Sequence, residues 1–276
     1  MNYGQIIHQL EQELSPFGED KESLLYAFKE LKGWNQTDLV LNLSKEVEAA
    51  DNRLLIEIAE QLKTHTPAQY IAKTAYFREL VLKVDDRVLI PRPETEELVQ
   101  LIIEENTDEK LDVLDIGTGS GAIALALAKV KKNWRLTASD ISLDALELAR
   151  ENAEKNQVQL NLIQSDLFRN ISGKFDIIVS NPPYISYKDK DEVDQNVFRH
   201  EPHLALFADE DGFAIYRQIA QSANSYLTEG GKLYLEIGYK QGEVLKQLFE
   251  QAFPNRRVRV LKDSFDKERM VVVDYG

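Results

Sequence analysis

Apolar residues in the first part of the chain recur at the spacing of one helical face. They lie three or four positions apart, as in an amphipathic helix. The runs are Ile6, Ile7, Leu10 and Leu14; Leu24, Leu25, Phe28 and Leu31; and Leu54, Leu55, Ile58 and Leu62. Gly18 and Gly33 separate the runs, and Thr64-His65-Thr66-Pro67 marks the end of the last helix. The pattern predicts a small helical bundle over residues 1–75.

Two short apolar runs follow the helical region. Leu80-Val81-Leu82-Lys83-Val84 and Arg87-Val88-Leu89-Ile90 flank the polar pair Asp85-Asp86. Apolar runs on either side of a short polar turn are typical of paired strands. Residues 76–95 are therefore expected to form a β-hairpin linker.

Beyond this linker, strand-like and helix-like runs alternate. The strand-like runs lie at 111–114, 135–139, 160–164, 175–180 and 232–237. This alternation predicts parallel βαβ units. The runs 257–261 and 270–274 have no helix-like segment between them, so we expect an antiparallel pair at the edge of the sheet. Residues 96–276 are expected to form one α/β domain.

The charge of the chain bears on the choice of partner. The 276 residues carry a formal net charge of -14, from 33 Lys and Arg against 47 Asp and Glu. A nucleic-acid partner would then need a local basic patch. The basic clusters Lys129-Val130-Lys131-Lys132 and Arg256-Arg257-Val258-Arg259 are short, and we expect each on a solvated face. The composition favours a protein partner, with no direct nucleic-acid binding.

Several other classes of site find no support in the sequence. The chain has no cysteine, which excludes a disulfide framework, a thiolate nucleophile and a cysteine-based metal site. His200 and His203 flank Pro202, a spacing that suits a loop better than a helical metal-binding pair. We expect no metal. The start lacks a leader pattern and no apolar run approaches membrane-spanning length, so we expect a cytoplasmic protein without membrane association.

A glycine-rich turn lies between a strand-like and a helix-like run. The segment reads Asp115-Ile116-Gly117-Thr118-Gly119-Ser120-Gly121, and the helix-like run 122–129 follows it. Glycines at such a junction let the backbone turn sharply and approach a ligand, and the helix N-terminus adds N–H donors. The Gly-x-Gly-x-Gly spacing differs from the Gly-x-Gly-x-x-Gly of dinucleotide binders. The turn predicts a nucleotide-like cofactor other than NAD or FAD.

Two later strand ends carry further acidic residues. Asp140 closes the run 135–139 and is placed to accept hydrogen bonds from both ribose hydroxyls. Its alternative role is a helix cap, for which Ser142 is the better candidate because the next helix is expected to begin near Leu143. Asp166 and Leu167 follow the run 160–164 and are expected to border an adenine, although an aspartate after a strand is also an ordinary turn residue.

The segment Asn181-Pro182-Pro183-Tyr184 follows the apolar run 175–180. Two prolines remove backbone N–H donors, so the loop is rich in carbonyl acceptors. The Asn181 side-chain oxygen and a carbonyl beside Pro182 could hold a planar NH2 group, and the Tyr184 ring could stack on it. Taken alone, the segment could equally be a turn that ends a strand.

Four strand ends, at Asp115, Asp140, Asp166 and Asn181, therefore carry polar candidates. Ligands of open α/β sheets bind at the carboxyl ends of the strands. One crevice could collect all four. Such a crevice, together with an Asn181 to Tyr184 segment that could hold an NH2 group, favours transfer of a group from a nucleotide-like cofactor onto a nitrogen.

The chain resembles the S-adenosylmethionine-dependent methyltransferases, specifically the release-factor glutamine methyltransferases of the PrmC/HemK family. The supporting stretches are Ile90 to Glu96, Asp115 to Gly121, Asn181 to Tyr184, Glu201 to Leu206 and Glu236 to Gly238. The resemblance implies an N-terminal substrate-recognition domain that is followed along the chain by a Rossmann-like seven-stranded methyltransferase domain. It also implies N5-methylation of the glutamine amide in the Gly-Gly-Gln motif of peptide-chain release factors, with S-adenosylmethionine as donor.

An adenine-N6 or guanine-N2 nucleic-acid methyltransferase would use the same Asn-Pro-Pro-Tyr clamp on an extruded base. Residues 1–75 hold seven Lys and Arg against twelve Asp and Glu, which suits recognition of a protein better. A non-catalytic scaffold that binds the cofactor is a third class, and the presence of both the glycine turn and the clamp argues against it. The family expectation is therefore the leading hypothesis.

Overall fold

The computed structural model describes residues 1–276 and divides them into two compact units. The first unit comprises Met1–Thr74, Val84–Asp86 and Val193–Glu201. The second comprises Ala75–Lys83, Arg87–Glu192 and Pro202–Gly276. Each unit has its own apolar core.

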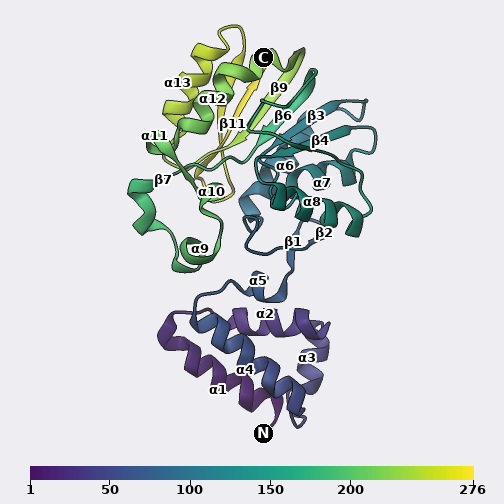
Figure 1. Cartoon of the computed structure of the whole chain (residues 1–276), viewed down its shortest axis with the longest axis vertical. Coiled ribbons are helices and arrows are strands. Elements are labelled where there is room, and N and C mark those ends of the chain that lie inside the picture. The colour runs from purple at the N-terminus through teal and green to yellow at the C-terminus, as the bar shows by residue number, and fades with distance from the viewer. The chain divides into compact units, whose positions relative to one another are not determined.

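The first unit is a bundle of helices, as the apolar spacing predicts (Figure 1). The bundle comprises α1 (Tyr3–Leu14), α2 (Lys21–Lys32), α3 (Gln36–Asn42), α4 (Ala49–Lys63) and α5 (Ala68–Ala72), with a short 3-10 turn, η1 (Ser15–Phe17). α9 (Gln195–His200) belongs to the same unit but contributes no residue to its apolar core. The predicted face residues are mostly buried, but Leu31 is 44% exposed because it lies near the end of α2. Gly18 and Gly33 end η1 and α2 with φ values of 75° and 65°, which glycine adopts readily.

A hairpin begins the second unit, but its strands differ from those predicted. β1 (Ala75–Phe77) pairs antiparallel with β2 (Leu80–Leu82), and Phe77 lies opposite Leu80. The predicted strand at 80–84 contains β2, but its predicted partner at 87–90 is wrong, because β2 pairs with the preceding segment 75–77. Val88 and Ile90 are buried without belonging to a strand, and burial alone produced their strand-like alternation.

A seven-stranded sheet forms the centre of the second unit, in the order β10-β11-β9-β6-β3-β4-β5. The strands are β3 (Asp112–Ile116), β4 (Arg135–Asp140), β5 (Asn161–Gln164), β6 (Phe175–Ser180), β9 (Leu227–Glu236), β10 (Arg257–Lys262) and β11 (Glu268–Asp274). β3, β4, β5, β6 and β9 run parallel, while β11 pairs antiparallel with both β9 and β10. The predicted parallel units and the closing antiparallel pair are confirmed.

Helices cover both faces of this sheet (Figure 1). α6 (Pro93–Glu105), α7 (Ala122–Val130) and α8 (Leu143–Lys155) pack with the hairpin on one face, and α12 (Ala214–Ser222) and α13 (Gly242–Ala252) pack on the other. Each face of the sheet therefore has its own apolar core: the first core lies under α6, α7 and α8, and the second core lies under α12 and α13. Neighbouring strand residues alternate between the faces, so Val113 packs in the first core and Leu114 in the second core. Shorter elements complete the unit: β7 (Ile185–Ser186), η2 (Tyr187–Glu192), α10 (His203–Leu206), β8 (Phe207–Ala208), α11 (Asp209–Gly212) and η3 (Ala223–Ser225).

The two basic clusters are only partly solvated, which corrects the expectation for them. Lys131 is 8% exposed, and its Nζ donates to the Asn106 carbonyl at 2.9 Å and pairs with Asp108 at 2.5 Å. Arg259 donates to both carboxylate oxygens of Glu105 at 2.8 Å and also pairs with Asp274. These cations neutralise carboxylates within the chain.

None of the helices combines the length and the apolar character that crossing a bilayer requires.

Candidate functional site

A cavity of about 240 Å³ opens at the carboxyl ends of the parallel strands. β3 lies between β4 and β6, and the chain proceeds from β3 outward through β4 and β5 before returning to β6. This reversal makes the β3–β6 border the switch point where open α/β sheets bind ligands. The loops after β3, β4, β5 and β6 all contribute to the cavity wall, as the four predicted strand ends require.

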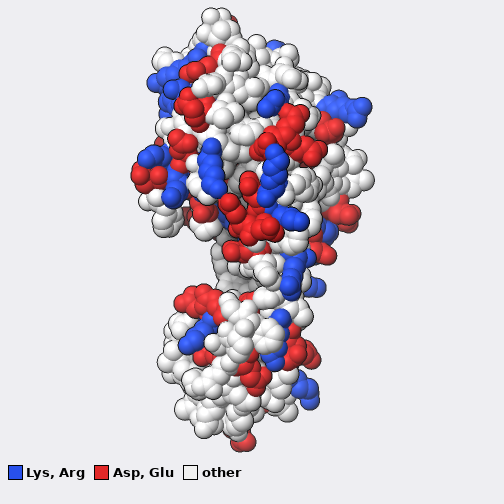
Figure 2. Space-filling model, turned by 90° about the vertical axis from the view of Figure 1, so that its left-hand side faces the viewer, with Lys and Arg blue, Asp and Glu red and all other residues white.

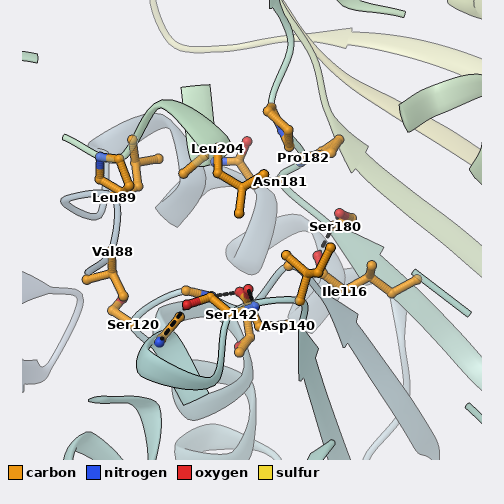
Figure 3. A pocket seen from close by; sticks show the side chains of 18 of the residues that line it. Val88, Leu89, Ile116, Ser120, Asp140, Ser142, Ser180, Asn181, Pro182 and Leu204 are labelled. Carbon is orange, nitrogen blue, oxygen red and sulfur yellow. Dashed lines mark hydrogen bonds between the residues drawn. The ribbon is translucent and has the colours of Figure 1, made fainter. Parts of the chain in front are cut away.

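Most of the predicted site residues line this cavity. They are Gly117, Thr118, Gly119, Ser120, Asp140, Asp166, Leu167, Asn181, Pro182 and Pro183. Figure 3 shows Asp140 and Ser142 on one side of the cavity, with Asn181 and Pro182 on the other. The structure does not bring Asp115, Gly121 or Tyr184 to the wall.

The glycine turn after β3 is held by its backbone. Gly117 N and Thr118 N donate to the Ser139 carbonyl at 2.8 and 2.9 Å, which fastens the turn to the end of β4. Gly117 and Gly119 adopt φ values of 71° and 52°, and a Cβ on either would meet no protein atom within 4 Å. The backbone here borders open space, so a ligand can approach it closely.

Gly121 has a different role from the other two glycines. Its φ is 83°, and a Cβ would lie 3.2 Å from Leu125 Cδ1 and 3.4 Å from Ala149 Cβ. Gly121 therefore permits close packing at the start of α7.

Asp140 presents a carboxylate to the cavity from the end of β4. Its Oδ2 accepts from Gly119 N at 2.9 Å, and its Oδ1 accepts from Ser142 N at 3.0 Å. Ser142 itself caps α8, because its Oγ accepts from Ala145 N at 3.2 Å, as predicted. Burial raises the pKa of Asp140. Each carboxylate oxygen keeps acceptor capacity for a further donor.

Asp115 supports the glycine turn from inside the protein. Its side chain is fully buried, and its Oδ2 accepts from Thr118 Oγ1 at 2.6 Å. Its Oδ1 has no hydrogen-bond partner. Burial raises the pKa of Asp115 to about 7. Any influence of this carboxylate on a ligand must therefore act through the turn.

The turn after β5 places Asp166 and Leu167 at the wall. Asp166 is exposed, and Leu167 is half-buried with a φ of 48°. Ser165 Oγ fixes this turn, because it donates to the Leu167 carbonyl at 2.8 Å and accepts from Asn170 N at 3.0 Å. A left-handed leucine is uncommon and is tolerated where the surrounding contacts enforce it. The turn offers an apolar side chain and a carboxylate to one ligand.

The Asn-Pro-Pro turn after β6 is held by side chains. Ser180 Oγ donates to the Ile116 carbonyl at 2.7 Å, which joins the ends of β6 and β3. Asn181 Nδ2 donates to Thr95 Oγ1 at 3.2 Å. Pro182 and Pro183 offer no N–H to the cavity. The turn thus presents carbonyl oxygens and few donors.

Tyr184 lies away from the wall and packs against the second core. Its carbonyl accepts from Gln241 Nε2 at 3.1 Å, and burial raises the pKa of its hydroxyl to about 12. The predicted stacking ring is therefore half-buried against the second core and does not line the cavity.

Other wall residues carry no prediction of their own. They include Val88, Leu89, Pro91, Arg92, Thr95, Ile141, Leu204, Ala205 and Ile215. Several fall in the stretches Ile90 to Glu96 and Glu201 to Leu206, which carry the family resemblance. Those stretches could have marked them as site residues, whereas their apolar character alone is typical of any core.

Charged side chains of both signs are interspersed on the molecular face in Figure 2.

No group of three or more His, Asp or Glu side chains has the geometry to hold a metal ion.

Comparisons with known proteins agree with this architecture. The model of the family described as Methyltransferase small domain matches residues 94–205, and that of the PrmC N-terminal domain matches residues 5–72. The fold is similar to the crystal structure of a methyltransferase from Pyrococcus furiosus, with a TM-score of 0.56, 22% sequence identity, and coverage of 80% of this chain and 98% of that chain. The fold is that of a methyltransferase.

Sequence relatives narrow this class. A release factor glutamine methyltransferase from Streptococcus pneumoniae is 56% identical over 100% of this chain and 99% of its own length. Another from Lactococcus lactis subsp. lactis is 49% identical over 92% of this chain and 94% of its own length. The chain belongs to the family of the release factor glutamine methyltransferases, which confirms the resemblance seen in its motifs.

Proposed function

We propose that this protein transfers a methyl group from S-adenosylmethionine to the side-chain amide nitrogen, N5, of the glutamine in a Gly-Gly-Gln motif of a peptide-chain release factor. One observation carries the proposal: the glycine turn after β3 and the Asn181-Pro182 turn after β6 face the same cavity. The first turn suits a nucleoside, and the second suits an NH2 group. Family membership selects the amide of a glutamine among possible NH2 groups.

The cavity residues fit the adenosine part of the cofactor. Asp140 would accept from the ribose hydroxyls with the acceptor capacity that Gly119 and Ser142 leave it. Leu167 and Ile141 would cover the base, and Asp166 would accept from its exocyclic amine. When bound, S-adenosylmethionine supplies a methyl group activated by its attachment to a positively charged sulfur.

The Asn181-Pro182 turn would hold the acceptor amide. An amide nitrogen is a poor nucleophile because its lone pair is delocalised into the carbonyl. Asn181 Oδ1 and the carbonyl beside Pro182 would accept the two N–H bonds and fix the plane of the nitrogen. These oxygens also favour positive charge on that nitrogen, so their contribution would be largest as the new N–C bond forms and the S–C bond of the donor breaks. The nitrogen would then lose one proton to water, and the demethylated thioether would leave as the second product.

The helical unit would recognise the body of the release factor and take no part in the chemistry. α3 exposes two adjacent apolar residues, Val40 at 56% and Leu41 at 64%. Replacing both with serine should weaken methylation of an intact release factor and leave a short Gly-Gly-Gln peptide unaffected. Equal effects on the two substrates would contradict this assignment.

Mass spectrometry tests the activity directly. The protein is incubated with methyl-labelled S-adenosylmethionine and, separately, with a release factor, a release factor whose motif glutamine is replaced by glutamate, bulk tRNA and DNA. We expect one added methyl group, on the motif glutamine of the unmodified factor alone. A label on adenine or guanine instead would assign the protein to nucleic-acid methylation. We also propose a cytoplasmic location, where such a substrate would be found, and no direct nucleic-acid binding, which the net charge of -14 disfavours.

A further inference from the structure

A chain of hydrogen bonds runs from the interior of the second unit to the cavity wall. Thr95 Oγ1 donates to Glu236 Oε2 at 2.6 Å, and Asn181 Nδ2 donates to Thr95 Oγ1 at 3.2 Å. Glu236 is 1% exposed and Thr95 is 4% exposed, so water does not replace these bonds. Thr95 and Asn181 line the cavity, while Glu236 lies behind them at the end of β9.

The direction of this chain follows from the available hydrogens. An ionised carboxylate can only accept, and a threonine hydroxyl has a single hydrogen. Thr95 must therefore donate to Glu236 and can only accept from Asn181. The group of Asn181 that faces Thr95 must then be its NH2, which leaves Oδ1 on the other side of the planar amide.

We propose that Thr95 and Glu236 are positioning residues that hold the Asn181 side chain with Oδ1 available to accept an N–H of the substrate amide. This inference rests on the proposed function. Without the chain, the Asn181 amide could turn by half a rotation and present NH2 to the substrate NH2. Two donors would then face each other, and no hydrogen bond would form between them.

The protonation of Glu236 controls the direction of the chain. Burial raises the pKa of Glu236 to about 7. The charged and titratable groups around it are Arg92, Glu94, Tyr184, Tyr216 and Arg269, which come from α6 and its start, the segment after β6, α12 and β11. A protonated Glu236 can either accept from Thr95 or donate to it, and when it donates, Thr95 can donate to Asn181 Oδ1, so the amide is no longer held in one orientation. The single-turnover rate should therefore rise with pH through about 7.

Single-turnover methylation of a release factor, at saturating cofactor and substrate, tests the proposal. Thr95→Val keeps the side-chain shape without the hydroxyl and should lower the rate at least about tenfold, while Thr95→Ser should restore most of it. Cofactor affinity, measured by calorimetry, should stay within about threefold in both variants. A wild-type rate in Thr95→Val would overturn the proposal.

A double variant separates positioning from a general structural role. If Thr95 acts through Asn181, adding Thr95→Val to Asn181→Ala should lower the rate no further. A further tenfold loss in the double variant would mean that Thr95 acts elsewhere.

Glu236→Gln provides a second test that does not depend on the folding of Thr95→Val. It should bind cofactor, methylate slowly and lose the rise in rate near pH 7. A rise that persists in this variant would overturn the role of Glu236. A wild-type enzyme that does not methylate the release factor would remove the proposed function and this inference together, whereas an active wild type with unaffected variants would remove the inference alone.

Discussion

The turns after β3 and β6 meet at one cavity but differ in the residues that form them. The turn after β3 has glycines with positive φ and backbone N–H groups, whereas the turn after β6 has two prolines and an asparagine. A threonine hydroxyl that donates to a buried carboxylate supports each turn: Thr118 of the first turn donates to Asp115, and Thr95 of α6 donates to Glu236 behind the second turn. Of these two threonines, only Thr95 also accepts a hydrogen bond from a side chain of the cavity wall, that of Asn181.

This difference suggests a division of labour. Gly117 and Gly119, which have no side chains, let the backbone of the first turn lie against a nucleoside, and the contribution of this turn is cofactor affinity. The second turn, in which two prolines lack N–H groups, offers acceptors to an amide, and its contribution is the rate of transfer. Substitutions in the two turns should therefore change different measured quantities.

The largest effect is expected from Asn181→Ala. Removing the side-chain acceptor should lower the single-turnover rate about 100-fold or more, the size of effect seen when one preorganised polar group is removed from a reaction centre. Cofactor affinity, measured by calorimetry, should change little. Asn181→Asp keeps the shape and an acceptor, so its rate should fall between those of Asn181→Ala and the wild type.

Gly119→Val should weaken cofactor binding by about 10- to 100-fold, because a branched residue at φ 52° is strained and its Cβ enters the space beside the turn. Gly173→Val is the matched control. Gly173 also has a positive φ, 92°, with nothing within 4 Å of a Cβ, and it does not line the cavity. The control should lose stability but keep its affinity for S-adenosylmethionine; equal affinity losses in both variants would count against a cofactor role for Gly119.

Asp140→Ala should weaken cofactor binding by about 1–3 kcal/mol, since two hydroxyls lose their acceptor. Part of the loss comes from Gly119 N and Ser142 N, which lose the same carboxylate. Asp144→Ala, which removes an exposed carboxylate at the first turn of α8, should leave calorimetric affinity unchanged. Unchanged affinity in Asp140→Ala would remove the ribose assignment.

Asp115→Asn should alter the pH dependence of stability. The pKa of Asp115 is raised from about 4 in the unfolded chain to about 7 in the folded protein. Between these values the folded state alone keeps the proton, so this group's stabilisation is present below about pH 4 and is lost as pH rises to about 7. Over that range, the free energy of unfolding of the variant should fall less steeply with pH than that of the wild type. The two slopes should differ by at most about the contribution of one bound proton. Denaturant titrations at several pH values would measure it, and an unchanged slope would contradict the buried, protonated Asp115.

Tyr184→Phe should have the smallest effect. The ring packs in the core and the hydroxyl does not reach the cavity wall, so the single-turnover rate should stay within about threefold of the wild type. Tyr184→Ala should instead lower the melting temperature, because it leaves a cavity in the second core. A large loss of rate in Tyr184→Phe would restore a direct role in substrate binding.

The order of elements and most wall residues could be predicted from sequence because both depend on local patterns. Helical spacing locates α1, α2 and α4, and strand ends locate Asp140 and Asn181. The second strand of the predicted hairpin, at 87–90, is wrong because buried loop residues such as Val88 show the alternation of a strand. Likewise, a position at a strand end does not say which way a side chain points, so Asp115 could not be distinguished from Asp140.

The support behind Asn181 could not be predicted. Thr95 and Glu236 are 141 residues apart in sequence, and Thr95 is 86 residues from Asn181. Only the fold brings α6, β6 and β9 to one point. Contacts of this kind depend on the path of the whole sheet, which no local pattern contains.

The division of labour is tested most directly by the single-turnover rate of release-factor methylation as a function of S-adenosylmethionine concentration. Asp140→Ala and Asn181→Ala are compared with the wild type in the same titration. Asp140→Ala should need more cofactor but approach the wild-type plateau, whereas Asn181→Ala should saturate at the wild-type concentration with a plateau about 100-fold lower. Plateaus lowered equally in both variants, or a wild-type plateau in Asn181→Ala, would contradict the separate roles of the two turns.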